Sequence, residues 1–298
     1  MKIRLAFGLS TALLLAGTAY AQQATQDQPA GDLVPPTSAS DFTAGQLDAV
    51  LAGSWRSATN KARDVYRHPK ATLQFFGLQP DQTVIEITPG AGWYSEILAP
   101  LLRDNGHYIA AIAGGNDAEQ KQDASALHTK FAGDPAEYGK ASIVTFNPKA
   151  PVFGPPGSAD MVLTFRNVHN WAMAGTAPAM FKAFYTVLKP GGTLGVVDHR
   201  AAPGANFDAI KGSGYLPTDY VIKLATDAGF KLDAQSEINA NPKDTKDYPK
   251  GVWTLPPTLT LGDQDRAKYL AIGESDRMTL RFVKEAKAPA ASSSATAH

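Results

Sequence analysis

The stretch from Val84 to Leu98 constrains the fold of this chain more than any other. Its first part, Val84-Ile85-Glu86-Ile87, is β-branched and almost continuously apolar, which is typical of a parallel strand buried on both faces. Gly90 and Gly92 follow, and glycine permits a tight turn and a close approach of the backbone to a ligand. Apolar residues then recur at helical spacing. A strand, a glycine turn and a helix in this order predict a ligand site of the nucleotide-binding kind at the carboxyl end of the strand.

Beyond this stretch, apolar strands alternate with amphipathic helices. Strands are expected at 108–113, 141–146, 160–165, 193–198, 230–238 and 278–283, and helices at about 118–131, 177–188 and 217–228. The last two strands have no strong helix between them, which suggests an antiparallel edge. The pattern predicts an α/β fold with a doubly wound, mostly parallel sheet of seven strands. The long, proline-bearing segment 239–276 is expected to be a functional or surface excursion.

The first 21 residues predict a secretory signal peptide. Lys2 and Arg4 form a charged start, an apolar run follows from Leu5 to Gly17, and Ala19-Tyr20-Ala21 has the form of a cleavage site. The apolar run is too short to span a bilayer, which argues against a membrane anchor. We therefore expect export to the periplasm or beyond, cleavage after Ala21, and no stable membrane insertion of the mature chain.

The remainder of the chain divides into a linker, one domain and a tail. Residues 22–40 are rich in Gln, Ala, Pro and Ser and indicate a linker, and the Ala/Ser/Pro-rich tail 286–298 is expected to be disordered. Between them we expect a single domain over 41–285, with a helical cap at 41–78 and the α/β core at 79–285. Cap helices are expected at 44–53, 57–66 and 70–76, and they could cover the carboxyl edge of the sheet.

Composition narrows the classes of function. The chain has no cysteine, which excludes disulfides, thiolate catalysis and cysteine-ligated metal sites. Basic and acidic residues both number 28, so loss of Lys2 and Arg4 leaves 26 against 28 and a net charge of −2. That balance argues against nucleic acid or an anionic membrane as the main partner. A small-molecule substrate is the expected partner, and the sequence leaves the oligomeric state open.

Three segments, in order along the chain, resemble the class I S-adenosylmethionine-dependent methyltransferases. They are the strand and glycine turn at 84–92, the strand at 160–165, and the helix, turn and strand at 184–194. More closely, the chain resembles a group of exported bacterial proteins described as methyltransferases, in which four pieces recur: Tyr66-Arg67-His68-Pro69, Pro89-Gly90-x-Gly92-Trp93-Tyr94, Arg166-Asn167-Val168-His169-Asn170-Trp171 and Asp198-His199-Arg200. The resemblance covers roughly 55–283. It implies a Rossmann-like methyltransferase fold, S-adenosylmethionine as cofactor, and a small acceptor that could be anionic.

The resemblance also implies which residues hold the cofactor: Glu86, Thr88, Gly90, Gly92, Trp93 and Asn167. Two positions depart from the family pattern. Thr88 stands where the family has its first glycine, and the acid that usually ends the second strand and binds the ribose is absent. Asn116 or Asp117 could replace that acid. Glu86 is retained, and it would face the methionine part of the cofactor or its waters, or else cap backbone amides of the turn.

In the strand order of that family the fourth and fifth strands are neighbours, so their carboxyl ends open onto one crevice. The candidate catalytic residues brought together there are Arg166, His169, Asp198, His199 and Arg200. A histidine can act as a general base near neutral pH, and an arginine can hold a carboxylate or phosphate. The alternative for the two arginines is a structural ion pair with Asp198 or a contact with a helix C-terminus. Further substrate residues are expected to be Trp171, as an apolar wall, and Arg63, Arg67 and His68, folding over from the cap.

Three functions are compatible with these residues. The first is an exported methyltransferase of small molecules. The second is a non-catalytic or repurposed protein that binds a nucleoside-like or anionic ligand on the same fold; the missing second-strand acid and the cytoplasmic origin of S-adenosylmethionine favour it. The third is a metal-dependent hydrolase that uses His68, His169 and His199 with Asp198. No close-spaced ligand motif supports that third function, and we expect no metal site.

Overall fold

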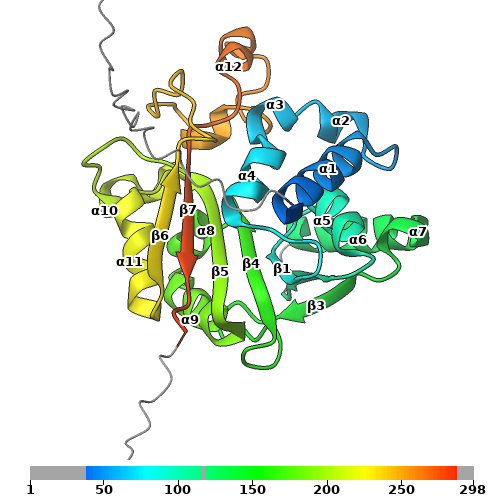
Figure 1. Cartoon of the computed structure of the whole chain (residues 1–298). Helices are drawn as coiled ribbons and strands as arrows, with labels where there is room; N and C mark the ends of the chain where they lie inside the picture. The colour runs from blue at the N-terminus through cyan, green and yellow to red at the C-terminus, as the bar shows by residue number, and fades with distance from the viewer. Residues whose placement is uncertain (1–37, 116–117, 287–298) are drawn as a thin grey trace, which may run out of the picture. The chain divides into compact units, whose positions relative to one another are not determined.

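The computed structural model describes residues 38–115 and 118–286 of the chain (Figure 1). The predicted signal peptide, most of the predicted linker, Asn116, Asp117 and the tail from 287 onward lie outside the described residues. No helix in the described ranges combines the length and the apolar character needed to cross a membrane.

A seven-stranded sheet lies at the centre of the domain, in the order β3-β2-β1-β4-β5-β7-β6. The strands are β1 (Thr83–Ile87), β2 (His107–Ala113), β3 (Ser142–Phe146), β4 (Ala159–Phe165), β5 (Leu188–His199), β6 (Lys231–Ser236) and β7 (Arg277–Val283). Strand β7 runs antiparallel to both of its neighbours, and the remaining pairs are parallel. The predicted α/β class, the seven strands and the antiparallel edge are confirmed. Because β1, β4 and β5 are adjacent and parallel, their carboxyl ends meet at one edge of the sheet.

Helices cover both faces of the sheet, as Figure 1 shows. On one face lie α8 (Val168–Ala174), α9 (Ala177–Val187) and α11 (Thr218–Ala228), and on the other α1 (Ser38–Ala52), α4 (Pro69–Phe76), α5 (Ser95–Leu102) and α6 (Ala118–Gly133). Alternate residues of a strand point to opposite faces. Accordingly Ile85 packs in the first layer with Phe181 and Phe184, whereas Val84 packs in the second with Phe76 and Ile97.

The helical cap differs from the prediction in two places. Helix α1 begins at Ser38, so the last residues of the predicted linker are helical. The helix predicted over 57–66 is instead two single turns, α2 (Ala58–Lys61) and α3 (Asp64–Arg67). His68 then takes a left-handed conformation, with φ of 42°, before Pro69 begins α4. A residue before proline is disfavoured in the right-handed helical region, which explains the break.

The carboxyl edge of the sheet is covered by segments that the sequence pattern did not define. The excursion between β6 and β7 carries a 3-10 turn, η2 (Gly251–Thr254), and α12 (Arg266–Ile272). The loop after β5 carries α10 (Phe207–Ile210) and η1 (Lys211–Ser213). Helix α8 after β4 was also not predicted. These short elements, together with α2 and α3, bring side chains to the strand ends. The single turn α7 (Pro135–Tyr138), which precedes β3 at the amino edge of the sheet, was likewise not predicted.

Candidate functional site

The glycine loop after β1 has a backbone that ordinary residues rarely adopt. Gly90 and Gly92 have φ of 60° and 86°, and a Cβ on Gly92 would lie 2.8 Å from Leu127 Cδ1. Thr88 itself has φ of 51°. The threonine therefore takes the left-handed conformation that a glycine in its place would adopt freely, at a cost of about 1 kcal/mol. The backbone at this position is therefore left-handed even though Thr88 replaces the expected glycine.

Asn167 ties this loop to the end of β4. Its Nδ2 donates to the carbonyl oxygens of Ile87 at 3.0 Å and Thr88 at 3.3 Å, and to Thr164 Oγ1 at 3.3 Å. With the amide hydrogens used in this way, Asn167 Oδ1 can accept a hydrogen bond from a ligand. Thr88 Oγ1 is buried and has no hydrogen-bond partner among the described residues. The loop thus presents two oxygen atoms that a bound ligand could satisfy.

Glu86 lies at the end of β1, directly before the loop, and is 3% exposed. Tyr108 donates its hydroxyl to Glu86 Oε2 at 2.6 Å, and Ser95 Oγ lies 3.4 Å from the same oxygen. Its partners are therefore two side-chain hydroxyls, and not the backbone amides of the turn that one of the predicted roles required. Burial raises the pKa of Glu86 to about 7, and the two hydroxyl hydrogen bonds oppose that rise. The carboxyl group consequently carries its proton for much of the time at neutral pH.

Trp93 connects the loop to the cap. Its Nε1 donates to the carbonyl oxygen of Asn60 at 3.0 Å, and the Arg67 guanidinium carbon lies 4.5 Å from its ring centroid. This distance is typical of a cation–π contact. The indole was predicted to contact the cofactor; in this structure it holds the cap arginines beside the glycine loop.

The predicted meeting of the two histidines at the ends of β4 and β5 is present. Their ring centroids are 4.9 Å apart, and both rings are almost fully buried. Asp198, the buried acid between them, accepts from His169 Nδ1 at 2.8 Å, from the His169 backbone amide at 3.2 Å and from the His199 amide at 2.7 Å. A proton on Nδ1 of His169 leaves Nε2 as the nitrogen that can accept a proton. Asp198 thereby fixes both the position and the tautomer of His169.

The second histidine has both ring nitrogens occupied. His199 Nδ1 lies 2.5 Å from Ser275 Oγ, and Arg166 donates through Nε to His199 Nε2 at 3.4 Å. Burial lowers the pKa of His199 well below its usual value, and the nearby Arg166 charge lowers it further. His199 is therefore a neutral positioning group in this arrangement, and His169 is the better candidate base.

Arg200 does not face the crevice as an open anion clamp. Its guanidinium makes paired hydrogen bonds with Asp276, at 3.0 and 2.8 Å, and with Glu237, at 2.6 and 2.7 Å. The predicted alternative of an ion pair is the arrangement observed, although the partners are these two acids and not Asp198. Because both edges of the guanidinium are used, Arg200 joins the ends of β5, β6 and β7.

The cap brings residues to the sheet edge, and their predicted contact with a substrate stays a prediction. Arg63 donates to Glu274 Oε1 at 2.6 Å, and Arg67 Nε lies 3.5 Å from Oε2 of the same carboxylate. His68 is exposed; it is not grouped with His169 and His199, but it lines a cavity with Glu274. The predicted role of Trp171 is corrected as well. Its indole is buried in the core against Phe184, with ring centroids 5.6 Å apart, because α8 turns this side chain toward α9.

Several residues at the site were missed by the sequence analysis. Glu274 and Ser275 come from the end of the excursion, Arg277 begins β7, and Trp253 comes from η2. The polar run Glu274-Ser275-Asp276-Arg277 leads into the apolar part of β7. Since β7 is antiparallel, its amino end lies at the same edge as the carboxyl ends of β4 and β5. That polar run was the signal that could have identified these residues.

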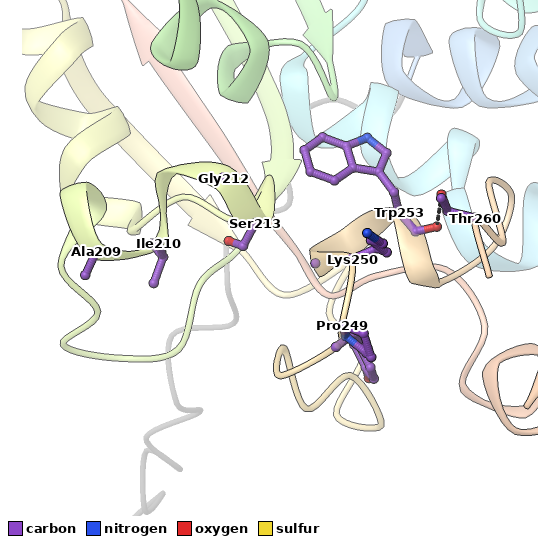
Figure 2. Close-up of a pocket in the computed structure, with 10 residues that line it drawn as sticks. Ala209, Ile210, Gly212, Ser213, Pro249, Lys250, Trp253 and Thr260 are labelled. Atoms are coloured by element: carbon purple, nitrogen blue, oxygen red, sulfur yellow. Dashed lines mark hydrogen bonds between the residues drawn. The ribbon is translucent and has the colours of Figure 1, made fainter. Parts of the chain in front are cut away.

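Two cavities are lined by residues that contact the histidine pair, although neither histidine lines them. The larger, of about 680 Å³, lies between the α10–η1 loop and η2, and Figure 2 shows Ser213 on one wall and Lys250 and Trp253 on the other. The Trp253 ring centroid is 6.1 Å from that of His169. The smaller, of about 250 Å³, is lined by Glu274, Ser275 and Arg277, with His68 and Lys243. The larger volume is within the range of small-molecule sites.

A metal site at the histidine pair is geometrically possible but electrostatically disfavoured. His169, Asp198 and His199 place ligand atoms within 4.8 Å of one another. The Arg166 guanidinium, however, donates directly to His199 Nε2. A permanent positive charge at that distance opposes a second cation.

No protein-family model matches the sequence of this chain, and no curated protein matches it either. Its structure is similar to that of an S-adenosylmethionine-dependent methyltransferase of Aquifex aeolicus, with a TM-score of 0.51 and 14% identity over 75% of this chain and 93% of that one. A methyltransferase of Methanosarcina mazei gives 0.50 and 15%, over 72% and 97% of the two chains. The cyclase SpnF gives 0.51 and 15%, over 83% and 94%. These likenesses establish the class I methyltransferase fold, and the cyclase is a reminder that one fold can carry different reactions.

Proposed function

We propose that this protein is an S-adenosylmethionine-dependent methyltransferase that acts on a small acceptor after export to the periplasm or beyond. The observation that carries the proposal is the left-handed glycine loop at the carboxyl end of β1, in a sheet of methyltransferase strand order. The resemblance to exported bacterial methyltransferases and the signal-peptide pattern of residues 1–21 support the location.

The loop residues fit the cofactor. Gly90 and Gly92 allow close approach of the backbone, and Thr88 Oγ1 is an orphaned buried oxygen beside them. Asn167 Oδ1 offers an acceptor at the end of β4. Asn116 and Asp117 remain the predicted ribose-binding residues. When bound, this cofactor supplies an electrophilic methyl group on a sulfonium centre.

The residues of the chain would position the acceptor and take its proton. The acceptor would enter the larger cavity, whose wall includes Trp253, and place its nucleophilic atom within reach of His169 Nε2. His169 Nε2 would take the proton that the acceptor atom loses. The positive charge that develops on the ring faces Asp198, 2.8 Å from Nδ1. General-base assistance of this kind contributes about 100-fold to 10,000-fold in rate, and alignment of the reacting atoms supplies the remainder.

Calorimetry with S-adenosylmethionine and S-adenosylhomocysteine tests cofactor binding directly, and formation of S-adenosylhomocysteine with a panel of small acceptors tests turnover. His169→Ala should reduce turnover by about 100-fold or more. His128→Ala is the matched control, because His128 is exposed on α6, outside the crevice. Absence of binding of either cofactor form at millimolar concentration would contradict the methyltransferase assignment. Full turnover in both His169→Ala and His199→Ala would remove the crevice from the mechanism.

The main alternative is a binding protein for a nucleoside-like or anionic ligand on the same fold. It is favoured by one observation, namely that β2 ends in Ala113 without the acid that usually binds the ribose. This alternative predicts saturable binding of S-adenosylhomocysteine without turnover of any acceptor.

A further inference from the structure

Four arginines surround one buried carboxylate at the carboxyl edge of the sheet. Glu274 is 3% exposed; Arg63 and Arg277 lie 2.6 and 3.2 Å from its oxygens, and Arg67 lies at 3.5 Å. Arg166, from the end of β4, interacts electrostatically with Glu274 and with Arg67. Asp198 also supports the charge of Arg166, but two carboxylates do not balance four arginines in a region of low water content. The cluster therefore has an excess of positive charge.

Two of these arginines lack the hydrogen bonds that a buried guanidinium normally makes. Within the described ranges, Arg67 donates no hydrogen bond: its Nε lies 3.5 Å from Glu274 and is without a partner in hydrogen-bonding geometry, although the side chain is nine-tenths buried. Arg166 donates one, the 3.4 Å contact with His199 Nε2. Each guanidinium has five N–H groups. Most of the donors of these two side chains are thus available to a ligand.

We propose that Arg67 and Arg166 form a binding site for an oxyanion, a carboxylate or phosphate group, carried by the ligand of the crevice. Arg63 and Arg277 complete the positive surroundings, and Glu274 holds them in place. The site itself is inferred from this geometry alone; the assignment of the anion to cofactor or acceptor rests on the proposed function.

A purely structural role for the cluster does not account for this arrangement. Arg200, on the next strand, shows how this fold satisfies an arginine: four hydrogen bonds to two carboxylates. Burial lowers the pKa of Arg67 to about 9 and of Arg166 to about 10, against the support of Glu274. Such a shift means that the charged state is stabilised less by its surroundings than by water. An oxyanion bound between the two groups would restore that stabilisation through paired, charge-assisted hydrogen bonds.

The location of the cluster connects it to the candidate base. Arg166 contacts His199, and His199 contacts Ser275, which lines the smaller cavity together with Glu274 and Arg277. The larger cavity instead approaches the pair through Trp253, whose ring centroid is 6.1 Å from that of His169. Two ligands have this chemistry: the carboxylate of the cofactor's methionine part, and an anionic group on the acceptor.

The test measures the affinity of the purified full chain for inorganic phosphate, S-adenosylhomocysteine and methylthioadenosine, which has the same adenosine and thioether but no amino acid group. Arg67→Gln and Arg166→Gln are the test variants. Arg103→Gln is the matched control, because Arg103 is an arginine outside the cluster that already pairs with Asp104 and Glu137. We expect phosphate to bind the native chain and the control alike, and to bind each test variant about tenfold more weakly or worse.

The nucleoside ligands identify the source of the anion. Weaker S-adenosylhomocysteine binding in the test variants, with methylthioadenosine unchanged, assigns the site to the cofactor carboxylate. Unchanged S-adenosylhomocysteine binding with weaker phosphate binding assigns it to the acceptor. If S-adenosylhomocysteine fails to bind the native chain, the methyltransferase proposal fails, but the phosphate comparison still decides the anion site.

Thermal melting without ligand separates a binding role from a structural one. Arg166→Gln removes one charge from a cluster with an excess of positive charge, so its melting temperature should equal or exceed that of the native chain, whereas Arg67→Gln also loses the contact with Trp93. Native-like phosphate affinity in both test variants, or no phosphate binding by the native chain, would overturn the proposal.

Discussion

Two buried carboxylates stand at the carboxyl ends of neighbouring parts of the same sheet, and they are used in opposite ways. Glu86 ends β1 and is held by the hydroxyls of Tyr108 and Ser95. Asp198, near the end of β5, accepts from a histidine ring and from two backbone amides. Both side chains are almost fully buried. The difference between them therefore comes from their partners and not from their exposure.

The comparison shows that hydrogen-bond partners can give two buried carboxyl groups at one sheet edge different properties. A hydroxyl can donate to a carboxylate and can also accept from a carboxylic acid, so the surroundings of Glu86 suit either protonation state. A backbone amide can only donate, so the surroundings of Asp198 suit an acceptor at every position. The carboxyl group beside the glycine loop, Glu86, can therefore be neutral, whereas the carboxyl group of the histidine crevice, Asp198, acts as a hydrogen-bond acceptor.

The largest effect is expected from Asp198→Asn, which places an NH₂ group where an acceptor is required. We expect turnover to fall by about 100-fold or more, because His169 loses the partner that sets its tautomer. The measurement is the pH–rate profile for S-adenosylhomocysteine formation, compared with that of the native chain. Asp160→Asn is the control: Asp160 binds Lys189 and the Thr83 amide at the opposite edge of the sheet. A native-like profile in Asp198→Asn would show that Asp198 does not position the base.

The second prediction concerns the pH dependence of stability through Glu86. Its pKa is raised from 4.5 in the unfolded reference to about 7 in the folded chain, so the folded form holds the proton more tightly. The resulting stabilisation is complete below pH 4.5 and is lost as pH rises through about 7, with a magnitude of about 3 kcal/mol. Urea unfolding at pH 5 and pH 8 should therefore show Glu86→Gln gaining stability relative to the native chain at the higher pH. An equal difference at both pH values would mean that Glu86 does not titrate in this range.

A smaller effect is expected at Thr88. Thr88→Gly removes the left-handed strain and the buried hydroxyl without a partner, and the greater flexibility of unfolded glycine offsets part of the gain. We expect a net stabilisation of about 1 kcal/mol in urea unfolding. Thr88→Val is the informative companion, because it keeps the strain and replaces only the hydroxyl by a methyl group. Weaker S-adenosylhomocysteine binding in both variants would identify Thr88 Oγ1 as a ligand contact, whereas a loss of stability in Thr88→Gly would contradict the strain argument.

The core of the fold was predictable because it depends on local pattern. Runs such as Val84–Ile87 and the stripe of Met180, Phe181 and Phe184 satisfy one periodicity each, and their burial follows from it. The single helix predicted over 57–66 was wrong, because this segment is held by tertiary contacts. Arg67 packs on Trp93, Arg63 and Arg67 both pair with Glu274, and α2 contains no buried residue whose spacing could reveal it.

The sequence predicted where the candidate site lies better than it predicted which residues form it. His169, Asp198 and His199 meet because two parallel strands end side by side, which the alternation of strands and helices implies. The roles of Arg200 and Trp171 depend on residues distant in sequence, Asp276 and Phe184. Glu274 and Arg277 arrive through a return strand whose direction the local pattern only suggested. Long-range pairing of charges leaves no periodic trace in a sequence.

The short helices α2 and α3 have one further consequence. They contribute no apolar side chain to the buried core, and the buried residue that they carry is Arg67. The helices that flank them, α1 and α4, carry the packing instead, through Leu47, Leu73 and Phe76. If Arg67 binds the ligand as proposed, ligand selectivity and folding stability depend on separate stretches of the cap. Replacement of residues 57–67 could therefore change the ligand specificity of the protein without unfolding it.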